Sequence, residues 1–114
     1  MIAVIFEVHP RPGAAPRYFE LAAALKSGLQ SIDGFISVER FESLAQPGRY
    51  LSLSFWRDEA AVRNWRCHGM HRHAQQEGRG DVLESYRLRV ATVVRDYGML
   101  VRDQAPSDSQ STLI

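Results

Sequence analysis

The stretch Ile2-Ala3-Val4-Ile5-Phe6-Glu7-Val8-His9 decides the fold that this sequence predicts. Its β-branched and aromatic residues are typical of a strand. Because side chains alternate along a strand, one face carries Ile2, Val4, Phe6 and Val8, and the other carries Ala3, Ile5, Glu7 and His9. Both faces are largely apolar, which indicates that the strand is covered on both sides.

The rest of the chain predicts two helices and three more strands. Apolar residues recur with a helical period over 14–32, and Asp58 is a suitable N-cap for a second helix. The predicted elements after the first strand are a helix over 14–32, strands over 35–43 and 49–56, a helix over 59–77 and a strand over 86–97. The order β-α-β-β-α-β predicts an α+β, ferredoxin-like fold, an antiparallel sheet with two helices on one face.

Length and composition indicate one globular domain over residues 1–100, followed by a polar, flexible tail over 101–114. The net charge is only +1, so we expect no nucleic-acid partner. No apolar stretch approaches the roughly 20 residues of a membrane helix, so we expect no membrane partner. Cys67 is the single cysteine and no basic leader is present, so we expect a cytoplasmic protein.

The strands have apolar residues on both sides, whereas both helices cover the same face of the sheet. A monomer would therefore leave an apolar patch in water. We expect a homodimer packed sheet to sheet.

Residues 65–75 hold the densest cluster of chemically functional side chains, including three of the four histidines. At about 100° per residue, His68, His71 and Gln75 fall on one side of a helix, where they would line one edge of a pocket beneath Trp65. The segment has no HExxH motif and no paired CxxC motif, so we expect no metal site.

Glu7 is a carboxylate within an apolar strand, which is costly unless the group is paired or set in a wet cavity. If the dimer covers the face of Val4 and Phe6, Glu7 points toward the helices. One interpretation is an ion pair with an arginine of a neighbouring strand, such as Arg89. The other is a general base in a dry pocket.

The aromatic residues also allow two interpretations. Trp56 and Trp65, with several phenylalanines and Tyr50, would either wall a site for a flat aromatic ligand or form the core.

Four local motifs resemble the antibiotic biosynthesis monooxygenase (ABM) domain family of the dimeric α/β-barrel superfamily. They are the opening strand 2–6, the turn and strand 33–39, the stretch 52–59 with 61–65, and the stretch 71–75 with 78–79 and 86–91. The resemblance spans residues 1–98. It implies a homodimeric α/β barrel, with a pocket between the sheet and the second helix.

The resemblance also implies an activity. Characterised relatives oxygenate anthrone-like or quinol-like substrates without metal or flavin, so we expect a small aromatic ligand and no cofactor. Either Glu7 or His71 would be the base, and Trp65 and Arg89 would help to position an anion. The residues that would complete the substrate site are His68, Gln75 and Trp56.

A second branch of the family degrades haem with an Asn on the first strand, a Trp on the second helix and a His ten residues later. Carried over to this sequence, these positions hold Glu7, Trp65 and Gln75, of which only Trp65 matches. Haem binding is therefore the alternative function, with His71 or His68 as a replacement ligand. A third alternative is a non-catalytic dimer that binds a small ligand.

Overall fold

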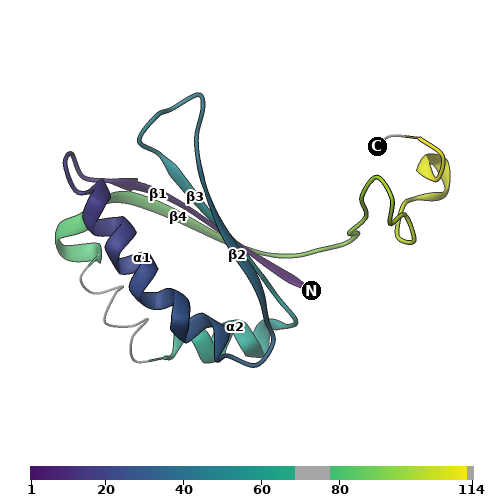
Figure 1. The fold of residues 1–114 in the computed structure, drawn as a ribbon, viewed down its shortest axis with the longest axis horizontal. Coiled ribbons are helices and arrows are strands. Elements are labelled where there is room, and N and C mark those ends of the chain that lie inside the picture. Colours follow the sequence, from purple (N-terminus) through teal and green to yellow (C-terminus); the bar gives the residue numbers. More distant parts are fainter. Residues whose placement is uncertain (69–77, 113–114) are drawn as a thin grey trace.

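The computed structural model describes residues 1–68 and 78–112. Four strands form one antiparallel sheet in the order β2-β3-β1-β4. The strands are β1 (Ile2–Pro10), β2 (Phe35–Glu42), β3 (Tyr50–Trp56) and β4 (Leu83–Thr92). The helices α1 (Ala15–Gln30) and α2 (Glu59–Arg66) lie on the same side of the sheet (Figure 1). The predicted ferredoxin-like fold is confirmed.

Two elements, the last strand and the second helix, differ from the predicted ranges by three residues or more. The last strand begins at Leu83 and ends at Thr92, earlier at both ends than predicted, and a short π-helical turn, Gly78–Val82, precedes it. The helix α2 ends at Arg66, because the His68 amide donates to the Trp65 carbonyl (3.0 Å) and closes a tighter turn there. The rest of the predicted second helix, 69–77, lies outside the described residues.

The core lies between the sheet and the helices, in two clusters. Near the start of β1, Ile2 packs with α1 and α2 side chains, and Val4 packs against this group. Near the end of β1, Val8 packs with Tyr18 and Val82. The even-numbered residues of β1 therefore face the helices, as their alternation predicts. We call the opposite side of the sheet, which neither α1 nor α2 covers, the open face.

Beyond β4 the chain leaves the sheet. The Val93 amide still donates to the Met1 carbonyl (3.0 Å), and residues 93–112 then form an arm that extends away from both helices (Figure 1). A 3₁₀ turn, Ser107–Ser109, lies within the arm. The radius of gyration is 16.2 Å, compared with about 13 Å for a compact chain of this length. That residues 101–114 are flexible in solution stays a prediction.

Candidate functional site

Trp65 lies at the centre of the helix side. The helix α2 begins at Asp58, whose carboxylate accepts a hydrogen bond from the Ala61 amide (2.9 Å). That N-cap fixes the start of the helix and turns Ala61, Val62 and Trp65 inward. The Trp65 ring also reaches α1, where a Cβ built on Gly28 would lie 3.4 Å from it. Trp65 is therefore held by both helices, and is buried in the larger core cluster.

His68 follows directly after α2 and lies against that tryptophan. The two rings are stacked, with centroids 5.7 Å apart and an interplanar angle of 25°. His68 is half-buried, while Trp65 is buried. The pair thus places a titratable imidazole at the edge of an apolar wall, which is one of the contacts that the sequence predicts.

An apolar strip on β4 lies on the same side of the sheet. Tyr86, Leu88 and Val90 are 54%, 50% and 43% exposed, and we call them the β4 shelf. Their register partners are Val8, Phe6 and Val4, all of which contribute to the core on the helix side. The Tyr86 ring meets the Phe6 ring edge-on, with centroids 5.7 Å apart. The shelf therefore continues the core surface outward from the two clusters and leaves it accessible to a ligand.

The other predicted tryptophan has a different place. Trp56 is 1% exposed, and its indole N–H donates to the Ser54 hydroxyl (2.9 Å). Its ring meets Phe35 edge-on within the core. Trp56 is thus a core residue in this structure and does not present a surface to substrate, because the sheet and helices enclose its ring.

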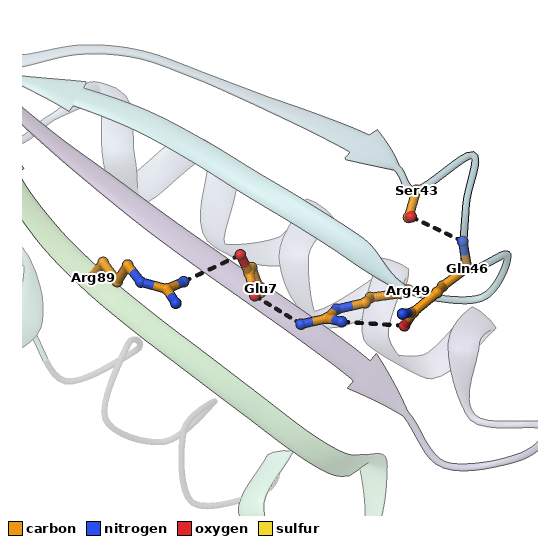
Figure 2. A network of polar contacts seen from close by, with 5 residues as sticks. All are labelled: Glu7, Ser43, Gln46, Arg49 and Arg89. Atoms are coloured by element: carbon orange, nitrogen blue, oxygen red, sulfur yellow. Dashed lines mark hydrogen bonds and ion pairs between the residues drawn. The ribbon is translucent and has the colours of Figure 1, made fainter.

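Glu7 lies on the open face, so the expectation that it points toward the helices is wrong. The face of Val4 and Phe6 packs on the helices, and alternation places Glu7 on the other side. One carboxylate oxygen accepts from Arg49 (2.8 Å) and the other from Arg89 (3.2 Å), as Figure 2 shows. The interpretation of Glu7 as the ion-pair partner of Arg89 is confirmed. Glu7 and Trp65 therefore do not share one pocket.

Arg49 is the member of this network that the sequence does not single out. It is the last residue of the turn before β3, and its guanidinium also donates to the Gln46 side chain (3.1 Å). The strand register could have identified it. Glu7 is paired with Leu51, and Arg49, two residues before Leu51, lies on the same face of the sheet. A hollow of about 340 Å³ lies beside Glu7 and Arg49 at the base of the β2–β3 hairpin.

Two predicted site residues, His71 and Gln75, lie outside the described residues. The positions carried over from the haem-degrading branch, Glu7 and Trp65, lie on opposite faces of the sheet. Within residues 1–68 and 78–112, no three His, Cys, Asp or Glu side chains gather closely enough to hold a metal ion. In the same residues, no helix has the length and hydropathy to span a bilayer.

Two curated proteins are similar in sequence. Over 93 residues the chain is 50% identical to the "Jasmonate monooxygenase ABM" of Pyricularia oryzae, covering 82% of this chain and 43% of that protein. It is 36% identical over 78 residues to the uncharacterised protein YqjZ of Bacillus subtilis, covering 68% of this chain and 67% of that one. The chain thus spans less than half the length of the Pyricularia protein.

Solved structures share the fold at low identity. Rv0793 from Mycobacterium tuberculosis has a TM-score of 0.75 at 20% identity, over 83% of this chain and 96% of that one. A candidate antibiotic biosynthesis monooxygenase from Deinococcus radiodurans has a TM-score of 0.77 at 15% identity, over 88% and 99% of the two chains. The sequence model of one family, described as antibiotic biosynthesis monooxygenase, matches residues 1–77. The chain belongs to the antibiotic biosynthesis monooxygenase family.

Proposed function

We propose that this protein oxygenates a small, largely apolar substrate on the helix side of its sheet, beside Trp65 and His68, without a cofactor. The observation that carries the proposal is the β4 shelf, three half-exposed apolar side chains that extend the core outward on the helix side of the sheet. Family membership supports the reaction class, and the 50% identity to a monooxygenase supports it further. A site of this kind, with apolar walls and few polar groups, suits a small organic ligand.

The reaction needs a base and an apolar surface that excludes water. The base removes an acidic proton from the substrate, the resulting carbanion passes one electron to O2, and the two radicals join in a new C–O bond. The hydroperoxide then loses water as its O–O bond breaks, which leaves a carbonyl on the substrate. In this scheme both atoms of O2 are accounted for, one in the product and one in water.

Among the described residues, His68 is the base that the geometry favours. Its imidazole stacks on the Trp65 ring, on the side of the sheet that carries the shelf. Glu7 and Arg89 are not assigned to the reaction, because they pair with each other on the open face. His71 remains a second candidate for the base from the sequence alone.

Two substrate classes follow from different arguments. The family resemblance suggests an anthrone-like or quinol-like aromatic compound. The name of the Pyricularia relative suggests jasmonate, which is a cyclopentanone with a carboxylate side chain. Both carry acidic protons next to a carbonyl or on a phenol, so the same base chemistry applies to either. We propose the aromatic class first and include jasmonate in the test.

The test is product formation with and without O2 on a panel of anthrones, quinols and jasmonate, with ¹⁸O2 to trace the new oxygen. We expect O2-dependent product that carries ¹⁸O, and a loss of kcat of about a hundredfold or more on His68→Ala, in the range for a general base. Leu88→Glu places a charge on the shelf and should raise KM. Leu44→Glu is its matched control, since Leu44 is a fully exposed leucine on the β2–β3 hairpin.

Several outcomes would replace the proposal. The absence of O2-dependent product above the uncatalysed rate, across the panel, contradicts it. Specific binding without turnover would identify a ligand-binding protein instead. A Soret shift on haem titration, with turnover only in the haem-loaded protein, would contradict the cofactor-free scheme.

We also propose that the protein works as a homodimer joined through the open face. That face carries half-buried Ile5, Leu51, Leu53 and Phe55, and exposed Phe41. Covering it would remove apolar surface from water, which favours association. Sedimentation velocity over a concentration series measures the dimer directly. A chain that stays monomeric at high micromolar concentration contradicts this part.

A further inference from the structure

The arm formed by residues 93–112 has a preformed structure of its own. The Arg102 guanidinium donates to the carbonyls of Gly98 (3.2 Å), Gln110 (3.2 Å) and Ser109. It also lies over the Tyr97 ring, 5.2 Å from the centroid. Ala105 is buried inside this small unit. The arm is thus held together by its own hydrogen bonds, and would lose little conformational entropy on docking.

Its apolar side chains, in contrast, point into solvent. The Gly98 amide donates to the Val101 carbonyl (2.8 Å) and closes a turn with Met99 and Leu100 at its tip. Leu100 is 91% exposed, and Met99 and Val101 are exposed beside it. We call residues 98–101 the arm turn. An ordered turn that presents adjacent apolar residues to water is typical of a docking element.

A complementary surface lies at the far edge of the sheet. A groove of about 230 Å³ runs along the start of β2, lined by Phe35, Ile36 and Val38 with Lys26 and Gln30 of α1 on its rim. Ile36 is exposed there, at the irregularity in the β2–β3 register. The groove therefore combines apolar side chains with the polar Ser37 and Gln30, and it carries one positive charge, that of Lys26. Residues 93–112 hold three aspartates and two arginines, an excess of one negative charge.

The sheet topology says which copy of the arm can reach this groove. The arm leaves from Thr92, which shares one end of the sheet with Ile2, Trp56 and Phe35 through the register. β4 and β2 are the two edge strands. If two open faces meet about a two-fold axis along the strands, β4 of one copy lies over β2 of the other, with like ends together. Each arm then leaves beside the partner's groove.

The area that a stable dimer needs also supports docking of the arm on a second copy of the chain. The nine residues of β1 span about 30 Å and four strands span about 20 Å, so the open face offers a footprint of about 600 Å². A standard interface takes about 800 Å² from each partner. The sheet alone therefore gives an interface at the lower end of the standard range, and a docked arm would enlarge it.

We propose that the arm docks on a second copy of this chain, with the arm turn in the groove beside β2. The proposal rests on the homodimer of the proposed function, and adds to it a segment beyond residue 77, where the family match ends. The exchange is reciprocal, since each copy gives an arm and receives one.

The first test compares two exposed leucines in the full chain. Leu100→Asp puts a charge into the apolar contact, and we expect it to raise the dimer Kd about tenfold or more. Leu44→Asp carries the same change at a 98% exposed hairpin leucine, and should leave the Kd within about twofold. Equal Kd values for Leu100→Asp and the unchanged chain, measured by sedimentation velocity, overturn the proposal.

The second test places the arm turn. One chain carries Leu100→Cys and another carries Ile36→Cys, both with Cys67→Ser so that the native thiol does not compete. Oxidation of the mixture should give a disulfide between the two chains, and Leu44→Cys in place of Leu100→Cys should not. A further variant carries Leu100→Cys and Ile36→Cys in one chain. A disulfide that forms only within that chain, and not between two chains, overturns the proposal. Equal crosslinking by Leu44→Cys also overturns it.

The outcomes separate this inference from the proposed enzyme. A dimer that is insensitive to Leu100→Asp but still oxygenates substrate defeats the arm proposal alone. A crosslinked dimer without O2-dependent product defeats the enzymatic proposal alone.

Discussion

Substitution of Glu7 by Gln tests most directly whether the two faces of the sheet have different roles. The side chain keeps its size and one oxygen acceptor, but loses the charge that holds Arg49 (2.8 Å) and Arg89 (3.2 Å). Both arginines are then left on the open face with no carboxylate between them. Because Glu7 lies away from Trp65 and the β4 shelf, the reaction should not need its charge.

The size of the effect follows from exposure. The Glu7 side chain is 31% exposed and both arginines are more exposed than that. In a single copy of the chain, each pair is therefore worth about 0.2–1 kcal/mol, which is the range for ion pairs in contact with solvent. We expect the free energy of unfolding to fall by about 1 kcal/mol, or about 3–6 °C in Tm for a chain of this length. Salt at about 1 M should reduce the difference, because it screens the pairs.

The assay combines urea unfolding with turnover on the same preparation. Glu39→Gln is the matched control, since Glu39 lies exposed on the same face, opposite Leu53, and loses the same charge. We expect Glu7→Gln to be less stable than Glu39→Gln, with kcat within about twofold of the unchanged protein. A loss of kcat of tenfold or more, in a variant that is still folded and dimeric, would refute the assignment of Glu7 to the open face.

Three further predictions concern the scaffold. Gly34 has φ +90°, and a Cβ there would lie 2.7 Å from the Ala61 Cβ, so Gly34→Ala should lower the free energy of unfolding by about 2–4 kcal/mol. Gly48 also has φ +90° but lies in open space, so Gly48→Ala should lower it by only about 1–2 kcal/mol. Equal losses for the two variants in urea unfolding would contradict the predicted clash with Ala61. Ser54→Ala leaves the buried Trp56 indole N–H without its acceptor and should lower the free energy of unfolding by about 1–3 kcal/mol. An unchanged Tm would contradict this prediction. The Ala61 amide and then Arg57 lower the pKa of the Asp58 carboxyl below its usual 3.8, so its contribution to stability is present above pH 3.8 and is lost as the pH falls through the lower folded value; Asp58→Asn should flatten that acid limb, and an unchanged pH dependence of Tm would count against it.

The fold could be predicted from the sequence because its signals are local and agree with one another. Alternation fixes the faces of β1 and β3, the helical period fixes α1, and Asp58 marks the start of α2. The predicted end of α2 was wrong, because a hydrogen bond from the His68 amide to the Trp65 carbonyl closes a tighter turn, and residue types alone do not predict that bond. Boundaries depend on such single hydrogen bonds, whereas periodicity depends on many residues.

The site was harder to predict because it depends on which face of the sheet the helices cover. That choice decides whether Glu7 meets the helices or the arginines, and both faces of β1 are apolar enough for either. The helices cover the face with Val8, where Tyr18 and Val82 complete a buried cluster. The contact of Trp65 with His68 was predictable, because the two residues are three positions apart and so lie on one side of the predicted helix.

The central claim is that the two faces of the sheet have different roles, with substrate on the helix side and a second copy on the open face. Methyl NMR of leucine and valine side chains tests it in one titration with an anthraquinone or jasmonate probe. The account predicts shifts at the methyl groups of Leu88 and Val90, with those of Leu51 and Leu53 unchanged. Shifts at Leu51 and Leu53, with Leu88 and Val90 unchanged, would contradict it.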